Sequence, residues 1–398
     1  MSPKFTVLAL VAMLSLLSSL AGHAQAREGA PIMPLAHKAL LLDVAAAGER
    51  VLVAGEHGII LYSDDDGDHW QQAMVPTHHM LTGIHFVDRQ KGWAVGHDGL
   101  ILVSDDGGEN WRIQRDGLAI QHQTNLETRE AAHRRVEELQ QRLATADGAS
   151  DDASDGASDD ASKEQLEVDL DDARIELEDA DLTLEEPVFT SPLMDVWFQD
   201  ANVGWAVGAF NTLVATRDGG QHWVNSDSVL NNPDQFHLNT VTGDGHGRVF
   251  IAGEGGVMFR SLDSGHSWES LEPFYDGSWF GAVYDARHDT LLVFGLRGHL
   301  YRSTDFGGTW EPTGAGNSNT LAGGNSSAEG GIVLAGGDGT VLLSADGGQT
   351  FRQDSLQDHL SLSSGLSRNG KLILVGQGGV KSGVKSEGKS GADGTDHE

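Results

Sequence analysis

The stretch GWAVGHDGLILVSDDGGENW, from Gly92 to Trp111, holds two short apolar runs around a glycine-bounded turn and ends in Ser-x-Asp-x-Gly-x-x-Trp. Two such runs with a tight turn between them are typical of a β-hairpin. The same unit returns almost unchanged from Gly204 to Trp223. This repeated unit predicts the fold more firmly than any other part of the chain.

The closing pattern of the unit, Ser/Thr-x-Asp-x-Gly-x-x-Trp/Phe, occurs six times, and we call each copy a box. The box aspartates are Asp65, Asp106, Asp218, Asp263, Asp305 and Asp346. Their intervals are 41, 112, 45, 42 and 41 residues, so one repeat carries an insertion. A period of about 40 residues suits a four-stranded blade of a β-propeller.

A seventh hairpin, LILVGQGGVKS from Leu372, has no box after it. Seven hairpins and six boxes predict an all-β fold, a seven-bladed β-propeller with an inserted α-helical hairpin. A strand from the chain start, around Pro31 to Leu35, is expected to complete the last blade. Such closure removes the free sheet edges that invite aggregation.

The boxes are predicted to be structural. An Asp in a tight turn accepts hydrogen bonds from backbone N–H groups a few residues ahead, and a nearby Gly supplies the positive φ of the turn. The Trp or Phe that follows can pack between blades. Six turns on separate blades are too dispersed to form one calcium or acid–base site.

These residues resemble the Asp-box, or bacterial neuraminidase repeat, of sialidases and several other propellers. The longer unit is similar to that of the photosystem II stability/assembly factor family, over roughly residues 30–115 and 190–380. The resemblance implies a propeller that assists assembly of a membrane protein complex. It extends to propellers of bacteria without photosystems, some of them associated with envelope transporters. This acidic chain lacks the family's basic Arg patch, and its acidic insertion is a second departure.

Met1 to Ala26 has the parts of a secretory signal peptide: Lys4, an apolar stretch from Phe5 to Leu20, and the cleavage pattern Ala24-Gln25-Ala26. Because the chain has no Cys, neither a lipid-modified cysteine nor a disulfide is expected. We therefore expect a periplasmic protein without a membrane anchor. The remaining divisions are 27–116 for blades one and two with the closing strand, 117–187 for the insertion, 188–380 for blades three to seven, and 381–398 for a disordered tail.

The insertion is acidic and helical in composition. Residues 117–187 contain 21 Asp and Glu against 6 Lys and Arg, part of a net charge of −33 for the whole chain. Such acidity argues against nucleic acid as a partner, because binding requires basic side chains at the phosphates. Two apolar stripes predict helices on either side of a disordered linker, residues 147–162. The stripes are Val136, Leu139 and Leu143, then Leu166, Leu170, Ala173 and Leu177.

The two helices can form a hairpin that packs on its own propeller or on a partner protein. They can also self-associate with a second copy as part of a coiled coil, or serve as an inert spacer.

Partner binding is expected on the face opposite the boxes, where the turns inside the central hairpins and the links between blades lie. The turns carry Glu56, His57, His97, Asp98, Phe210, Asn211, Glu254, Arg297, Asp338 and Gln377. The links add the aromatic residues Phe236, Phe274, Tyr275, Trp279 and Phe280, for which an interface and blade packing are both open. His37, His79, His237 and His359 precede innermost strands, but their spacing around a channel mouth disfavours a shared metal. No metal or cofactor is expected.

No catalytic motif stands in a supporting context, so we predict no enzymatic activity. The preferred interpretation is a non-catalytic scaffold or assembly factor for a membrane or envelope protein complex, with a transporter as one candidate. The alternative is a carbohydrate-binding or sialidase-like glycoside hydrolase propeller, because paired carboxylates that meet only in space leave no sequence pattern.

Overall fold

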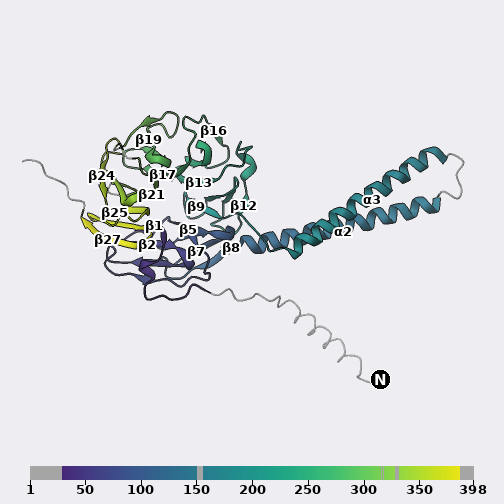
Figure 1. The fold of residues 1–398 in the computed structure, drawn as a ribbon, viewed down its shortest axis with the longest axis horizontal. Helices are drawn as coiled ribbons and strands as arrows, with labels where there is room; N and C mark the ends of the chain where they lie inside the picture. Colours follow the sequence, from purple (N-terminus) through teal and green to yellow (C-terminus); the bar gives the residue numbers. More distant parts are fainter. Residues whose placement is uncertain (1–28, 150–155, 315, 317, 328–330, 386–398) are drawn as a thin grey trace, which may run out of the picture.

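The computed structural model describes residues 29–149, 156–314, 316, 318–327 and 331–385. The predicted signal peptide and residues 386–398 of the predicted tail lie outside this range. Within it, the chain is mostly β with two long helices, and its strands form seven separate sheets, six of four strands and one of three. Figure 1 shows these sheets around a common centre, as in a β-propeller.

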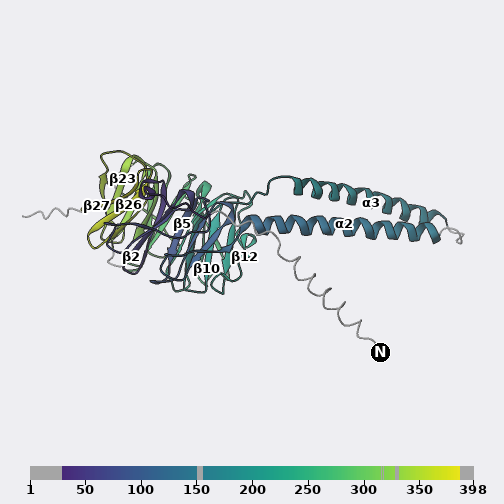
Figure 2. The ribbon, with the colours of Figure 1, turned by 90° about the horizontal axis from the view of Figure 1, so that it is seen from below.

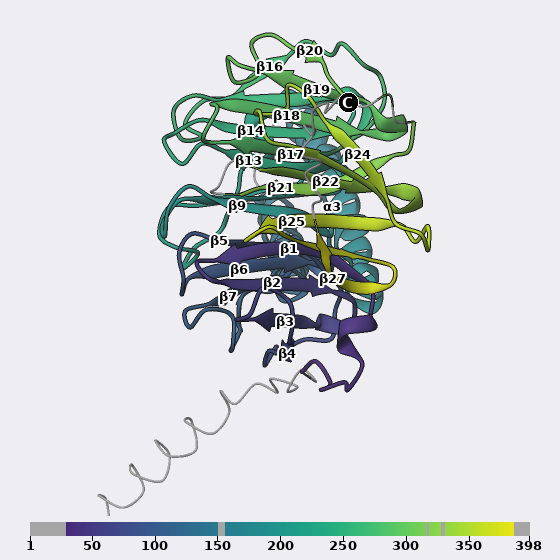
Figure 3. The same cartoon turned by 90° about the vertical axis from the view of Figure 1, so that its left-hand side faces the viewer.

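The innermost strand of each sheet contacts the innermost strand of the next, and the last contacts both its predecessor and the first. The sheets therefore follow one another in a ring. The innermost strands are β1 (Leu41–Ala47), β5 (Leu81–Phe86), β9 (Leu193–Phe198), β13 (Leu238–Gly243), β17 (Trp279–Asp285), β21 (Leu321–Ser326) and β25 (Leu362–Arg368). Viewed from the side in Figure 3, the strands cross the thickness of the disc.

The second strands are β2 (Arg50–Gly55), β6 (Gly92–Gly96), β10 (Gly204–Gly208), β14 (Val249–Gly253), β18 (Thr290–Gly295), β22 (Ile332–Gly336) and β26 (Lys371–Gly376). The third strands are β3 (Ile60–Ser63), β7 (Ile101–Ser104), β11 (Leu213–Thr216), β15 (Met258–Ser261), β19 (Leu300–Ser303), β23 (Thr340–Ser344) and β27 (Gly379–Lys385). Six sheets add an outer strand: β4 (Gln71–Gln72), β8 (Arg112–Arg115), β12 (Val224–Asn225), β16 (Glu269–Leu271), β20 (Glu311–Pro312) and β24 (Arg352–Ser355).

The core lies between neighbouring sheets rather than at the centre of the ring. The second strands are buried almost throughout, which explains their continuous apolar runs, because both faces of each sheet are covered by its neighbours. Between the first two sheets, Leu52 and Ile60 pack against Leu81, Leu102 and the box Trp111. The box tryptophan thus contributes to packing between sheets.

The three-stranded sheet contradicts one prediction. Residues Pro31–Leu35 form no strand, and the last sheet contains only β25, β26 and β27. The Gln72 side chain on β4 instead accepts the N–H of Met33 at 2.9 Å and donates to the carbonyl of Pro31 at 2.9 Å. The chain start is therefore held against the outside of the first sheet.

Packing joins the last sheet to the first. Val53 and Leu61 of the first sheet share a buried cluster with Leu366 and Ile373 of the last. The Ser382 hydroxyl on β27 also donates to the carbonyl of Gly67 at 2.8 Å. The expected tail is corrected as well, because β27 extends to Lys385.

The insertion forms two helices, α2 (Gly117–Ala149) and α3 (Gly156–Glu185), so most of the predicted disordered linker is helical. Residues 150–155 lie outside the described range. The two predicted stripes face each other: Val136 and Leu139 pack on Leu170 and Ala173. Figures 1 and 2 show the resulting hairpin extending outward from the propeller. No helix of the described residues is long and apolar enough to cross a membrane.

Candidate partner-binding face and central channel

The turns between second and third strands are all held at one end of the propeller, here called the turn face. In every sheet the first turn residue donates its N–H to the carbonyl of the residue that precedes the innermost strand. Representative distances are 3.0 Å for Glu56 to Leu40 and 2.9 Å for Glu254 to His237. The predicted turn residues and the links between sheets therefore lie at the same end of the molecule.

Several turn residues have a positive φ, which residues other than Gly rarely adopt. They include His57 (56°), Asp98 (61°), Phe210 (52°), Asn211 (59°) and Arg297 (58°). The turns containing them are η2 (Glu56–Gly58), η3 (His97–Gly99), η5 (Glu254–Gly256), η6 (Leu296–Gly298), η7 (Gly337–Gly339) and residues 209–212. His57, His97, Phe210 and Arg297 are exposed, with Phe210 54% accessible.

Other predicted turn residues are engaged locally. A carboxylate oxygen of Glu56 accepts the N–H of Leu40 at 2.8 Å, and Glu254 accepts that of His237 at 3.3 Å. The Asn211 side chain accepts a hydrogen bond from Asn232 at 2.9 Å. These side chains order the turns and are only partly accessible.

The aromatic residues between the fourth and fifth sheets mainly pack. Trp279 is completely buried and donates its indole N–H to the carbonyl of Gly256 at 3.3 Å, so its assignment as a partner-binding residue is wrong. Tyr275 is half-buried with its hydroxyl on the Leu296 carbonyl, 3.3 Å away. Phe274 is 40% exposed and contacts Tyr301, with ring centroids 4.7 Å apart and the ring planes tilted by 60°. Phe236 is also half-buried.

The predicted histidine ring is divided among separate turns. His79 pairs with Asp98 at 2.5 Å, and His359 pairs with Asp338 at 3.1 Å. His237 accepts the N–H of Phe210 at 2.9 Å through Nδ1. His37 lies in η1 (Ala36–Lys38). Among the described residues, no group of three or more His, Asp or Glu side chains is arranged to hold a metal.

A channel of about 290 Å³ runs between the innermost strands. Each innermost strand shifts its register at its second residue, as in a β-bulge, and that residue lines the channel. The seven bulge residues are Leu42, Thr82, Met194, Asn239, Phe280, Ala322 and Ser363. Of these seven, only Phe280 was singled out from the sequence, although the aligned strand starts LLDV, LTGI, LMDV and LNTV carry the signal for this position.

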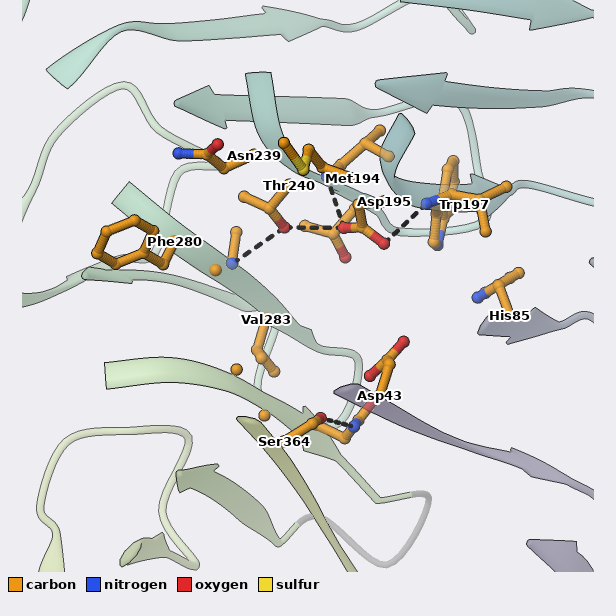
Figure 4. Close-up of a pocket in the computed structure, with 18 of the residues that line it drawn as sticks. Asp43, His85, Met194, Asp195, Trp197, Asn239, Thr240, Phe280, Val283 and Ser364 are labelled. Atoms are coloured by element: carbon orange, nitrogen blue, oxygen red, sulfur yellow. Dashed lines mark hydrogen bonds between the residues drawn. The ribbon is translucent and has the colours of Figure 1, made fainter. Parts of the chain in front are cut away.

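Two carboxyl groups reach into the channel from the residue after the bulge. Asp43 accepts the N–H of Val44 at 2.8 Å and that of Ile84, on the next sheet, at 3.0 Å. Asp195 likewise accepts from Val241 of the next sheet at 2.9 Å. Figure 4 shows both side chains facing the same cavity.

The channel environment shifts the pKa of both acids. Each carboxyl is only partly accessible, and its solvent contact is the narrow channel rather than open water. Burial raises the pKa of Asp195 to about 6. Burial raises the pKa of Asp43 to about 7, with a further contribution from the charge that Asp195 carries once it has ionised. Burial also lowers the pKa of His85, beside them, to about 4.

The boxes lie at the opposite end, here called the box face, where the third strands turn into the outer ones. The Ser or Thr hydroxyl donates to the box Asp and accepts a Gly N–H, as Ser104 does with Asp106 and Gly108 at 2.8 and 2.9 Å. Each Asp also accepts the N–H of the residue four positions ahead, here Asn110 at 3.0 Å. These bonds occupy the box carboxylates, and similar ones from His222 lower the pKa of Asp218 to about 2.

The channel does not have the composition of a sialidase site. No Lys or Arg is among its lining residues in the described part of the chain. Tyr284 lines it, but its hydroxyl donates to Asp289 at 2.8 Å and accepts from Arg248 at 3.1 Å. Burial and the bond to Asp289 raise the pKa of Tyr284 to about 12, which makes it a poor nucleophile at neutral pH. Arg248 is itself neutralised by Asp244 and Asp289, each 2.6 Å away.

Comparison with protein families gives a match to the family described as photosynthesis system II assembly factor YCF48. The match covers residues 68–133 and 178–320, just over half of the chain. The interval between the two matched parts falls within the helical hairpin. The matched parts thus lie mainly in the propeller, and most of the hairpin lies outside the match.

Curated relatives match over shorter segments. Photosystem II assembly lipoprotein Ycf48 of Synechococcus sp. (strain CC9902) is 35% identical over 79 residues, 20% of this chain and 23% of that protein. Photosystem II assembly protein Ycf48 of Thermosynechococcus vestitus is 40% identical over 57 residues, 14% of this chain and 16% of that protein. The aligned segments span less than a quarter of either relative.

Solved structures resemble almost the whole chain. YCF48 bound to D1 peptide gives a TM-score of 0.56 at 15% identity, covering 89% of this chain and 94% of that one. YCF48 from Cyanidioschyzon merolae gives 0.54 at 14%, covering 89% and 97%. The WD40 β-propeller domain of Doa1 gives 0.56 at 12%, covering 91% and 97%. At these identities the likeness establishes the propeller fold alone.

Proposed function

Since the chain belongs to the family of photosynthesis system II assembly factor YCF48, we propose that it is a non-catalytic, seven-bladed propeller that binds a protein partner through its turn face. The partner is a membrane or envelope protein complex, with a transporter as one candidate. The predicted signal peptide supports a periplasmic location for this activity. The structure of YCF48 with a D1 peptide supports a protein segment as the bound species.

One observation carries the choice of face. The turn face holds exposed side chains in fixed, positive-φ turns, and Phe210 is more than half accessible there. A bulky apolar side chain held in a strained exposed turn favours recognition over stability, since strain of this kind persists where function requires it. On the box face, by contrast, the repeated polar groups are hydrogen-bonded to one another.

The channel mouth completes the proposed surface. The bulge residues Leu42, Met194 and Phe280 offer apolar contact, and Asp43 and Asp195 lie one position deeper. This arrangement suits an extended segment that carries apolar side chains and a positive or neutral end. It also disfavours nucleic acid, whose phosphates would meet the two acids.

The test is affinity capture from detergent-solubilised membranes of the native host, with the tagged mature chain as bait. Phe210→Ala on the turn face should reduce recovery of the membrane protein partner at least about tenfold, in keeping with the loss of a central interface residue. Leu262→Ala is the matched control, because Leu262 is 58% exposed within a box on the other face. Equal loss in both variants, or a clear hit in a glycan-binding or hydrolase screen, would contradict the proposal.

A further inference from the structure

The helical hairpin has a second apolar stripe that its own packing does not use. Val168, Ile175 and Leu182 on α3 are 49%, 58% and 53% exposed. Residues seven apart in an α-helix differ by only about 20° around the axis, so the three form one line along α3. This line is separate from the stripe of Leu170 and Ala173 that faces α2.

The line is bordered mainly by acidic residues. The positions three and four residues before and after its members are Glu164, Gln165, Asp171, Asp172, Glu178, Asp179, Glu185 and Glu186. All eight side chains are exposed. Arg174 pairs with Asp171 at 3.1 Å, but within the described part of the chain no ion pair involves Asp172, Glu178 or Asp179. Apolar residues therefore alternate with unneutralised acids along one surface.

Two basic residues of α2 pair with other acids of α3. Arg129 pairs with Asp181 at 2.8 Å, and Arg135 pairs with Glu176 at 2.9 Å. The hairpin contacts the propeller through α2 and η3, and Figures 1 and 2 show α3 extending away from the sheets. The line on α3 is thus left open to an incoming molecule.

The charge around the line indicates which kind of molecule can bind there. Residues 163–186 contain eleven acidic and two basic side chains, a net charge of −9. A second copy would bring an equally acidic surface, and the chain outside residues 117–187 carries 38 acidic against 20 basic residues. The acidic line on α3 therefore repels both a second copy of the hairpin and the rest of its own chain. We propose that the line of Val168, Ile175 and Leu182 docks a basic amphipathic helix of a partner protein, with apolar residues every seven positions and Lys or Arg between them.

This surface is independent of the turn face and can be tested alone. The probe is a fluorescent synthetic peptide of about 21 residues with Leu at every seventh position and Lys three and four residues from each Leu. Fluorescence anisotropy is measured against the full mature chain, beside a scrambled peptide of identical composition. Binding should favour the patterned peptide at least about tenfold and weaken as salt rises.

Variants distinguish binding to the apolar line from simple charge attraction. The triple variant Val168→Ser, Ile175→Ser, Leu182→Ser should weaken binding at least about tenfold. Ile120→Ser is the matched control at a residue of α2 that is 48% exposed, and it should leave binding unchanged. Circular dichroism verifies that helicity is kept, and Asp172→Asn with Asp179→Asn offers a second test by weakening the salt dependence.

Three results would overturn the proposal. The first is no binding of the patterned peptide, and the second is equal binding of both peptides or of the triple variant. The third is self-association of the wild-type chain in sedimentation that the triple variant abolishes, because the occupant would then be a second copy.

Discussion

Asp195 on β9 accepts the backbone N–H of Val241 on β13 at 2.9 Å, so a channel carboxylate ties one sheet to the next. Asp43 makes the same connection to Ile84, and Thr240 accepts the N–H of Ala282 at 3.3 Å. The position after the bulge is therefore a connector between sheets as well as a channel lining. Gly83 occupies this position between the two acids and leaves room for Asp195.

The free energy of unfolding should fall as the carboxyl groups of Asp43 and Asp195 ionise. A carboxyl whose pKa is raised on folding binds its proton more tightly in the folded state, so its contribution is greatest below pH 4 and is lost as pH rises toward 7. The stability advantage of wild type over Asp43→Asn should therefore shrink by about 1–3 kcal/mol between pH 4 and pH 7. Urea denaturation at several pH values measures this difference.

Asp244→Asn is the control for that experiment. Burial raises the pKa of Asp244, but hydrogen bonds from Arg248 outweigh it and keep the pKa low. Its stabilising contribution is present above pH 4 and lost only as pH falls further, so its difference from wild type should stay constant between pH 5 and pH 7. A constant difference for Asp43→Asn as well would show that its carboxyl titrates normally.

Removing a box hydroxyl should destabilise the propeller. In Ser104→Ala the buried N–H of Gly108 loses its acceptor, which costs about 1–3 kcal/mol of unfolding free energy. Ser104→Thr should be nearly neutral, because Thr216 performs the same role in its own box, with its hydroxyl 2.8 Å from the N–H of Gly220. Chemical denaturation compares the three proteins, and equal loss in both variants would indicate a steric cause instead.

A turn-face glycine should resist substitution for a steric reason. Gly256 has φ +78°, and an added methyl group would overlap the carbonyl oxygen of Tyr275. Gly370 has φ +73° with open space around it, so Gly370→Ala reports the backbone penalty alone, about 1 kcal/mol. Gly256→Ala should cost about 2 kcal/mol more. Thermal unfolding of both variants tests the comparison, which fails if they are equally stable.

The repeated parts of this fold could be predicted because each is specified locally. The strand pairs, the box turns and the two facing stripes of the hairpin all follow from residues within one repeat or one helix. The closure could not be predicted. It depends on packing such as that of Val53 against Ile373 across the ring, which has no local signal. The position of the chain start likewise depends on the bond between Gln72 and Met33, which are 39 residues apart.

The candidate site was predictable only in outline. The turn face follows from the order of strands, but burial decides which aromatic residues are available to a partner. The sequence around Trp279 does not indicate whether its side chain is buried or exposed.

The prediction of a disordered linker was wrong for another reason. Its Asp, Ser and Gly residues are poor helix formers, yet α2 and α3 already pack through Leu139 and Leu170, and each further residue adds a hydrogen bond without a new nucleus.

The hairpin should unfold independently of the propeller. Its buried cluster, centred on Val136, Leu139, Leu170 and Ala173, includes no propeller side chain. Leu170→Ala removes a residue that is only 5% exposed, at a cost of about 2–5 kcal/mol, which a two-helix hairpin with one small buried cluster cannot absorb. All nine tryptophans lie outside residues 117–187, so their fluorescence follows the propeller alone. Leu170→Ala should therefore lower the helical circular dichroism at 222 nm and leave the fluorescence-detected transition in place. Leu102→Ala, at a fully buried propeller residue, should do the reverse. A shift of the fluorescence transition by Leu170→Ala would mean that the hairpin stabilises the propeller.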